Sequence, residues 1–286
     1  MSICVPFQVR AEQLHVMNEN LTVLKLGGAL LTDKQRPFTL RQSILDQAAA
    51  EVKACLDAGL LERLLLVHGV GSFGHPPVME YKLYKGFNAP SQLIHLTYTQ
   101  NRVMELRAAI AKACYKAGIP VSTILPSSCM TAVGAAQKSS ALDAAAGFLA
   151  IGMVPLLGGD MLADEQMGFC VYGGDKIAVD LALHFGASRL IFATAVDGIY
   201  DQDPHQHPAA QRVAQFSLSR GGSAVQLDTH QQVDASGAMA GKLAALHPAH
   251  DAMTAGLHVH VISMMKKGSL FALLNGEQEI GTIITP

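Results

Sequence analysis

Short apolar runs alternate with longer amphipathic segments along most of the chain. Five runs of four to six residues, rich in Leu, Val and Ile and bounded by glycine or polar residues, predict buried strands at 22–26, 64–67, 153–157, 189–194 and 257–262. Residues 39–56 place apolar side chains on one helix face and stop at Gly59, and 91–117 and 142–151 predict further helices. Strands separated by helices indicate an α/β fold with a mainly parallel sheet.

Several predicted strands run into glycine-rich turns. Gly27 and Gly28 follow the first strand, the stretch 66–75 (LVHGVGSFGH) follows the second, and Gly158 and Gly159 follow the third. Glycine lacks a Cβ and tolerates positive φ, so consecutive amides can close around an oxyanion. One such turn is a weak signal, and a strand-to-helix turn without a ligand is the alternative. Their recurrence after successive strands favours a phosphate site.

Charged residues beside these turns are the candidate chemistry. Lys25 lies inside a predicted buried strand next to two glycines, which favours a role at a phosphate over snorkelling to the surface. His75 closes its loop and can donate a hydrogen bond to the same anion. Asp160 would repel a phosphate, so we expect it to hold lysines in position. Lys242 ends a small-residue stretch that begins a helix, which favours phosphate contact.

Other candidates keep two interpretations. Lys34 lies in a polar loop, where a solvated surface lysine is as good an explanation as a functional one. Asp197 and Gly198 form either a simple turn or a nucleotide cradle with a carboxylate for ribose or hydrated magnesium. A helix that opens at 173–175 offers its N-terminus to an anion. The apolar side chains at 79–87 are either ordinary packing or a wall for a hydrocarbon tail.

Composition narrows the class of protein. The 286 residues are 50% hydrophobic and 15% charged, with a net charge of −2, which predicts a compact globular protein and no attraction for nucleic acid. Five widely spaced cysteines without a CxxC pair indicate reduced thiols and a cytoplasmic location. No apolar run reaches the length of a membrane span, and residues 1–20 lack a signal-peptide core, so we expect an N-terminal extension there.

Six motifs, in order, resemble those of the amino acid kinase superfamily. They are KLGG at 25–28, the loop 68–75, GGD at 158–160, GGD at 173–175, TAVDGIY at 194–200 and SGAMAGK at 236–242. Within that superfamily the chain resembles the isopentenyl phosphate kinases, because His75 closes its loop and Lys34 ends a Leu-Thr-Asp-Lys sequence. The resemblance implies a three-layer αβα sandwich over 21–286, with a substrate lobe at about 21–170, an ATP lobe at about 171–286, and a homodimer.

The resemblance also implies the reaction: transfer of the ATP γ-phosphoryl group to a small-molecule phosphate, isopentenyl phosphate, giving isopentenyl diphosphate. Lys25 would bridge the transferring group, Lys34 and Lys242 would neutralise ATP phosphates, and Asp160 would orient the lysines. Mg²⁺ would be held through ATP oxygens and water rather than by protein ligands. The acceptor phosphate is assigned to Gly69, Gly74, His75 and Gly159. The nucleotide is assigned to Lys25, Gly27, Gly28, Val70, Asp197, Gly198, Gly237, Ala238 and Lys242.

Two residues depart from the superfamily pattern. Val70 replaces the middle glycine of a His-Gly-Gly-Gly sequence, and Ala238 replaces a glycine near Lys242. A positive φ at either position would cost about 1 kcal/mol or more, whereas a negative φ removes the problem. We expect Val70 to leave its amide aimed at the phosphates. Two alternatives stay open: a related kinase for another phosphate or phosphonate, such as the fosfomycin kinases, and a ligand-binding protein without turnover.

Overall fold

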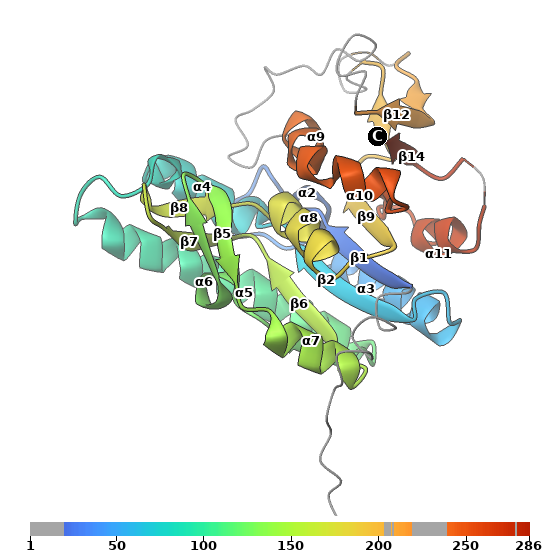
Figure 1. Ribbon diagram of the computed structural model, residues 1–286, viewed down its shortest axis with the longest axis horizontal. Helices are drawn as coiled ribbons and strands as arrows, with labels where there is room; N and C mark the ends of the chain where they lie inside the picture. The colour runs from blue at the N-terminus through green and yellow to red at the C-terminus, as the bar shows by residue number, and fades with distance from the viewer. Residues whose placement is uncertain (1–19, 203–206, 208, 219–238, 278) are drawn as a thin grey trace, which may run out of the picture.

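The structure, a computed structural model, describes residues 20–202, 207, 209–218, 239–277 and 279–286. An eight-stranded sheet runs through the molecule in the order β12-β14-β13-β9-β1-β2-β6-β3 (Figure 1). Neighbours from β13 to β3 pair in parallel, while β14 runs antiparallel to β13 and parallel to β12. The strands are β1 (Leu21–Leu26), β2 (Arg63–His68), β3 (Val121–Thr123), β6 (Val154–Gly158), β9 (Arg189–Thr194), β12 (Gln215–Ser217), β13 (His258–Ser263) and β14 (Thr282–Thr285).

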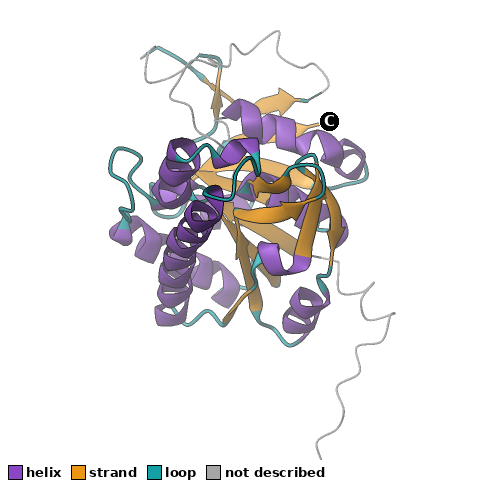
Figure 2. Ribbon diagram, turned by 90° about the vertical axis from the view of Figure 1, so that its left-hand side faces the viewer, coloured by secondary structure: helices purple, strands orange, loops and turns teal. Residues whose placement is uncertain are grey.

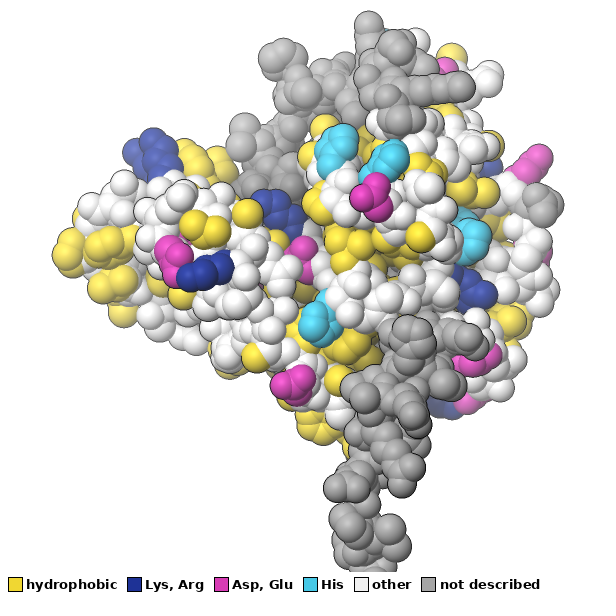
Figure 3. All heavy atoms as spheres, viewed as in Figure 1, with side chains coloured by type: hydrophobic (Ala, Val, Ile, Leu, Met, Phe, Trp, Pro, Cys, Tyr) yellow, Lys and Arg dark blue, Asp and Glu magenta, His cyan; other side chains and the backbone are white. Residues whose placement is uncertain are grey.

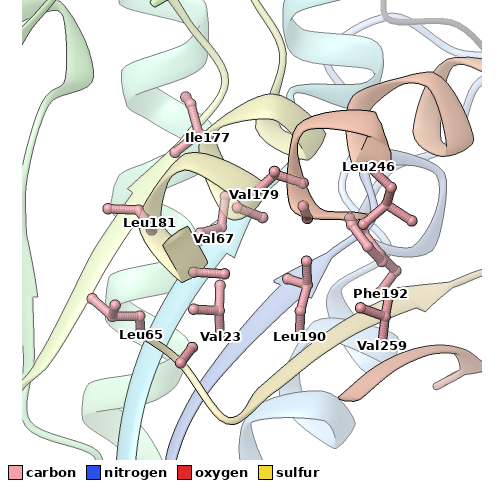
Figure 4. Packing of buried hydrophobic residues seen from close by; sticks show 14 of the residues in the cluster. Val23, Leu65, Val67, Ile177, Val179, Leu181, Leu190, Phe192, Leu246 and Val259 are labelled. Atoms are coloured by element: carbon pink, nitrogen blue, oxygen red, sulfur yellow. The ribbon is translucent and has the colours of Figure 1, made fainter. Parts of the chain in front are cut away.

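Helices cover both faces of this sheet, since alternate side chains of a strand point to opposite faces. Val23 packs in one core with α7 (Asp143–Ala150), α8 (Gly174–His184), α9 (Met239–Leu246) and α10 (His250–Thr254). Leu24 packs in a second core with α3 (Gln42–Asp57), α5 (Gln92–Lys116) and α11 (Ser269–Leu274). Figure 4 shows strand residues such as Val23 and Val67 beneath Val179 of α8. In Figure 2 the strands lie inside the molecule and helices flank them. The predicted α/β class with a mainly parallel central sheet is confirmed.

A second sheet, in the order β5-β4-β7-β8, lies at the left of Figure 1. The strands β7 (Asp160–Asp164) and β8 (Gly168–Tyr172) pair antiparallel as a hairpin and are mostly buried. Its partner hairpin, β4 (Met130–Val133) and β5 (Ala136–Ser140), follows the short helix α6 (Pro126–Cys129) and has no clear sequence signal, because β5 is polar and largely exposed. Asp164 joins the two hairpins. Against the opposing effect of burial, backbone amides from both turns lower its pKa to about 2.

The stretch 66–75 differs from the extended loop that the glycines predict. The helix α4 (Gly71–Glu80) begins at its second glycine and contains Pro76 and Pro77. A proline removes the amide that would bond to the carbonyl four residues earlier. The carbonyl of Ser72, left free in this way by Pro76, accepts the amide of Phe38 at 3.1 Å. The prolines therefore tie α4 to the loop that follows α2 (Gly28–Leu31) instead of breaking the helix.

The remaining elements are short. They are the helical turns η1 (Leu83–Lys85) and η2 (His247–Ala249) and the strand pair β10 (Ile199–Tyr200) and β11 (Arg212–Val213). Pro248 lies in η2, where it separates α9 from α10. Within the described ranges no helix is long and apolar enough to cross a membrane. On the face drawn in Figure 3, lysine and arginine side chains are spread out and form no continuous basic patch.

Candidate active site

Four glycine-containing turns meet at the carboxyl ends of β1, β2 and β6 and the N-terminus of α8. Their backbones touch. A Cβ on Gly28 would lie 2.4 Å from the amide nitrogen of Gly71, and one on Gly69 would lie 2.6 Å from that of Gly28. A Cβ on Gly174 would lie 2.6 Å from the carbonyl oxygen of His68. Real carbon atoms cannot come this close, so these positions admit only glycine. The turns that the sequence singles out therefore form one site.

Two buried lysines share one carboxylate at this site. Lys25 is the last of the inward row Leu21, Val23, Lys25 on β1, so its side chain faces the helix layer of α8 and α9. Its Nζ lies 2.8 Å from Oδ1 of Asp175, in the first turn of α8, and Nζ of Lys242, from α9, lies 2.8 Å from the same oxygen. Both lysine residues are 6% exposed. A Cβ on Gly69 would lie 3.4 Å from the Lys25 amine, so this amine lies beside the turn after β2.

This cluster carries more positive than negative charge. Burial favours protonation of Asp175, but the charges of Lys25 and Lys242 and their hydrogen bonds outweigh it and hold the Asp175 pKa well below its usual range. Burial, and then repulsion from Lys25, lowers the pKa of Lys242 to about 8 despite the attraction of Asp175. Two ammonium groups against one carboxylate leave a buried surplus of positive charge. An anion such as a phosphate would balance it.

The prediction that Asp160 orients the lysines is wrong. Asp160 begins β7, which leaves the central sheet, and its Oδ2 accepts hydrogen bonds from the backbone and hydroxyl of Ser127 at 3.2 and 2.9 Å. Its cationic neighbour is Arg107, at 3.9 Å. Asp175 takes the lysines because α8 packs directly over β1 and presents its first turn to the end of the Lys25 row. The sequence held a signal for Asp175 in the GGD at 173–175. A carboxylate there would repel a phosphate just as Asp160 would, so the same reasoning could have assigned the lysines to Asp175.

Val70 adopts a relaxed backbone. Its φ of −82° and ψ of −20° are helical values, and it caps the start of α4, so its Cβ causes no strain. A Cβ on Gly74 would lie 2.6 Å from Cγ2 of Val70, and one on Gly159 would lie 2.7 Å from Cγ1. The isopropyl group thus fills the gap between two glycines that the resemblance assigns to the acceptor phosphate. The aim of the Val70 amide stays a prediction.

The other predicted residues lie as follows. Gly74 and His75 are in α4, Gly74 buried and His75 half-buried, and Lys34 is exposed in the loop after α2. Gly27 begins α2, where a Cβ would lie 2.9 Å from the carbonyl oxygen of Ala193. Gly237 and Ala238 lie outside the described residues. The roles proposed for these residues stay predictions.

A cavity of about 400 Å³ lies beside the predicted Asp197 turn. It is lined by residues from the loop after β9, from the end of β13 with the segment into α11, and from the segment before β14, with Arg212 added from β11. Asp197 is exposed at its edge and accepts a hydrogen bond from the hydroxyl of Tyr200. Two basic residues, Arg212 and Lys266, and two acidic ones, Asp197 and Glu279, line it. Its size suits one ring system of a nucleotide.

The described residues contain no cluster of metal-binding side chains. Among them, no group of three or more His, Cys, Asp or Glu side chains comes together in a way that could hold an ion. Asp175, which follows the turn at 173–174, is already bonded to two lysines.

Comparison with known proteins decides the family. The model of the amino acid kinase family matches residues 20–263, which include the described glycine turns and both lysines of the cluster. The chain belongs to the amino acid kinase family. The resemblance of the six motifs is thereby confirmed, although the residue roles that it implies are not tested by the match.

Relatives within the amino acid kinase family include several isopentenyl phosphate kinases. That of Methanothermobacter thermautotrophicus is 30% identical over 274 residues, covering 93% of this chain and 99% of the relative. That of Methanocaldococcus jannaschii is 32% identical over 185 residues, covering 63% and 70%. A uridylate kinase of Nitrobacter hamburgensis is 27% identical over 199 residues, covering 69% and 75%.

Solved structures of the family are similar throughout. X-ray structures of isopentenyl phosphate kinase include one that matches with a TM-score of 0.78 and 28% identity, covering 93% of this chain and all of that one. A UMP kinase from Bacillus anthracis matches with a TM-score of 0.61 and 19% identity, covering 93% and 96%, which shows the shared fold alone.

The lysine cluster predicts a pH dependence that distinguishes Asp175 from Asp160. As pH rises through about 8, Lys242 loses its proton and with it the charge that attracts phosphates, so ATP affinity should fall. Asp175→Asn removes the attraction that keeps Lys242 protonated, so the fall should begin at lower pH. Asp160→Asn is the matched control and should leave the onset unchanged. ATP titrations between pH 6 and 9 measure both, and equal shifts in the two variants would contradict the assignment of Asp175.

The contacts of Val70 predict a rescue by double substitution. Gly159→Ala places a Cβ 2.7 Å from Cγ1 of Val70 and should reduce turnover about tenfold or more. Val70→Ala removes that carbon, so the double variant should recover most of the activity. Gly147→Ala is the control, because nothing lies within 4 Å of a Cβ there. The measurement is the steady-state turnover of the four variants. A double variant as slow as Gly159→Ala would show that the contact with Val70 does not cause the loss of turnover.

Proposed function

We propose that this protein transfers the γ-phosphoryl group of ATP directly to isopentenyl phosphate, giving isopentenyl diphosphate and ADP. The observation that carries the chemistry is the buried pair of lysines on one carboxylate, at the edge where the glycine turns meet. The choice of acceptor is supported by the relative from Methanothermobacter thermautotrophicus, which matches over nearly all of both chains. The product assigns the reaction to isoprenoid biosynthesis.

Positive charge and fixed amides supply the catalysis. The reaction brings two phosphate groups together, and their mutual repulsion opposes the approach of acceptor to donor. Lys25 bridges the transferring group and Lys242 neutralises the nucleotide phosphates, both held by Asp175, while exposed Lys34 adds charge from its loop. Because the lysines are buried and fixed before substrates bind, little reorganisation accompanies transfer. In-line transfer needs no covalent enzyme intermediate.

We keep the acceptor phosphate beside the turns after β2 and β6 and the start of α4, with Gly69, Gly74 and Gly159 as its predicted backbone contacts. The amides of Gly69 and Gly159 already donate to the carbonyl oxygens of Leu26 and His68, both at 2.9 Å, so these two turns shape the site and His75, half-buried in α4, donates the hydrogen bond to the phosphate. The apolar side chains at 79–87 are proposed to line the hydrocarbon tail. They lie beside a closed cluster in which Val78 and Leu83 pack against Met161 and Phe169 of the second sheet. Tyr84 and Phe87 are 42% and 46% exposed, so they offer apolar surface to the tail.

The nucleotide lies across the C-terminal half of the site. Its base or ribose fits the cavity beside Asp197 and Gly198, and its phosphates extend past Gly27, Gly28 and Val70 toward Lys242. We keep the predicted division into an acceptor lobe at about 21–170 and a nucleotide lobe at about 171–286. Mg²⁺ neutralises phosphate charge when bound with ATP, and the donor set fits a cation carried on ATP oxygens and water.

The assembly is proposed as a cytoplasmic homodimer. Exposed apolar residues on α5, among them Leu93, Ile94 and Met104, support an interface on that helix. Cys55, Cys114, Cys129 and Cys170 are free thiols, as expected in a reducing compartment.

The test of the reaction is ADP formation by the purified protein with Mg-ATP. Isopentenyl phosphate and fosfomycin are offered separately at matched concentrations, with ATP alone as the blank. We expect turnover of isopentenyl phosphate well above the blank and above fosfomycin. Preference for fosfomycin would keep the phosphate machinery and overturn the acceptor. Measurable ATP binding without turnover of either would instead support the ligand-binding alternative.

His75 should affect the acceptor and not the nucleotide. Losing a hydrogen bond to a charged group costs about 1.5–3 kcal/mol, so His75→Ala should lower kcat/KM for isopentenyl phosphate about 10- to 150-fold. The KM of ATP should stay within about twofold, because the lysine cluster that holds the nucleotide phosphates is intact. His75→Gln, which keeps a donor, should recover part of the loss, and His184→Ala at the far end of α8 is the control. Unchanged acceptor kinetics would remove His75 from the site.

A further inference from the structure

Arg107 breaks the pattern of its own helix. The buried positions of α5 are Thr99, Val103, Leu106, Arg107, Ile110, Ala113 and Cys114, a face that is otherwise apolar or small. The side chain of Arg107 is only 3% exposed. A buried guanidinium is costly unless several acceptors surround it. Its contacts should therefore show what the position does.

The guanidinium bonds to the ends of two neighbouring strands. Its Nε donates to Nε2 of His68, the last residue of β2, at 3.1 Å. Its Nη2 donates to the carbonyl oxygen of Gly159, just after β6, at 3.5 Å and lies 3.9 Å from Oδ2 of Asp160. The strand ends are also joined directly, since the amide of Gly159 donates to the carbonyl of His68 at 2.9 Å.

Arg107 also fixes the state of His68. An arginine Nε–H can only donate, so Nε2 of His68 must hold a lone pair and the ring proton must be on Nδ1, which faces the carbonyl oxygen of Gly69 at 3.2 Å. Burial, and next the charge of Arg107, lower the His68 pKa to about 3, so the ring stays neutral. That ring fills the space beside Gly158, where a Cβ would lie 2.2 Å from Nε2.

We infer that Arg107 is a positioning residue for the acceptor phosphate: through His68, Gly159 and Asp160 it fixes the spacing between the turns after β2 and β6. This inference rests on the proposed function, because the backbones of Gly69 and Gly159 are those assigned to the acceptor. Lys25 and Lys242 reach the site from the other side and depend on Asp175, which Arg107 does not contact. The acceptor and the nucleotide should therefore respond differently to changes at Arg107.

The test compares Arg107→Met, Arg107→Lys and the control Ile110→Val, a conservative change on the same buried face of α5. Arg107→Met removes the charge and all donors, and we expect the KM of isopentenyl phosphate to rise about tenfold or more while the KM of ATP stays within about twofold. Arg107→Lys keeps the charge but lacks the forked donors, so its KM for isopentenyl phosphate should lie between those of the wild type and Arg107→Met. Ile110→Val should match the wild type in both constants.

Folding and the His68 ring are followed in the same samples. Circular dichroism checks that each variant is folded. The ¹⁵N chemical shifts of the His68 ring should show a proton fixed on Nδ1 in the wild type. In Arg107→Met the proton should no longer prefer Nδ1 over Nε2. If Arg107→Met does not fold, Arg107→Lys decides. An unchanged acceptor KM in a folded Arg107 variant, or equal rises in both KM values, overturns the inference while leaving the proposed function intact. A wild type that does not use isopentenyl phosphate overturns both.

Discussion

Backbone contact between glycine turns is the constraint on which the rest of the site depends. Gly28, Gly69 and Gly174 each lie where a Cβ would meet the backbone of a neighbouring turn at 2.6 Å or less. The parallel sheet makes this contact possible, because strands that end together bring their following turns to one edge. The register of β1, β2 and β9 thus does two things at once. It aligns the apolar side chains that pack in the two cores, and it places Lys25 at the end of an apolar row facing α8.

Two buried charge clusters lie on opposite sides of His68 and Gly69, and they differ in balance. Lys25 and Lys242 share Asp175, which leaves a positive surplus that an anion would neutralise. Arg107 and Asp160 are matched in charge and are further satisfied by Ser127 and His68, so that cluster needs no ligand. A surplus of buried charge is a property of a binding site, whereas a balanced cluster holds structure. Binding and scaffolding are thereby separated within one glycine-lined edge.

The sequence was sufficient for the five longest strands of the central sheet and for the turns, because strand and helix periodicity and glycine placement are local signals. It failed where partners come from distant elements. Asp160 and Asp175 stand in the same Gly-Gly-Asp context, and only the packing of α8 over β1 decides which of them meets Lys25. It also took 71–75 for a loop, because the group that bonds to the Ser72 carbonyl is the amide of Phe38, which is distant in the sequence. Arg107 did leave a signal, a charge on an apolar helix stripe, but its partners could not be read from α5 alone.

Val70 and its neighbours bear on the alternative of a binding protein without turnover. That alternative drew on the strain that a β-branched residue would bring to a glycine position. The φ of −82° removes the strain, and both faces of the isopropyl group meet glycines, at 74 and 159, that leave room for it. Val70 is therefore accommodated without strain, and a loss of phosphoryl transfer does not follow from its presence.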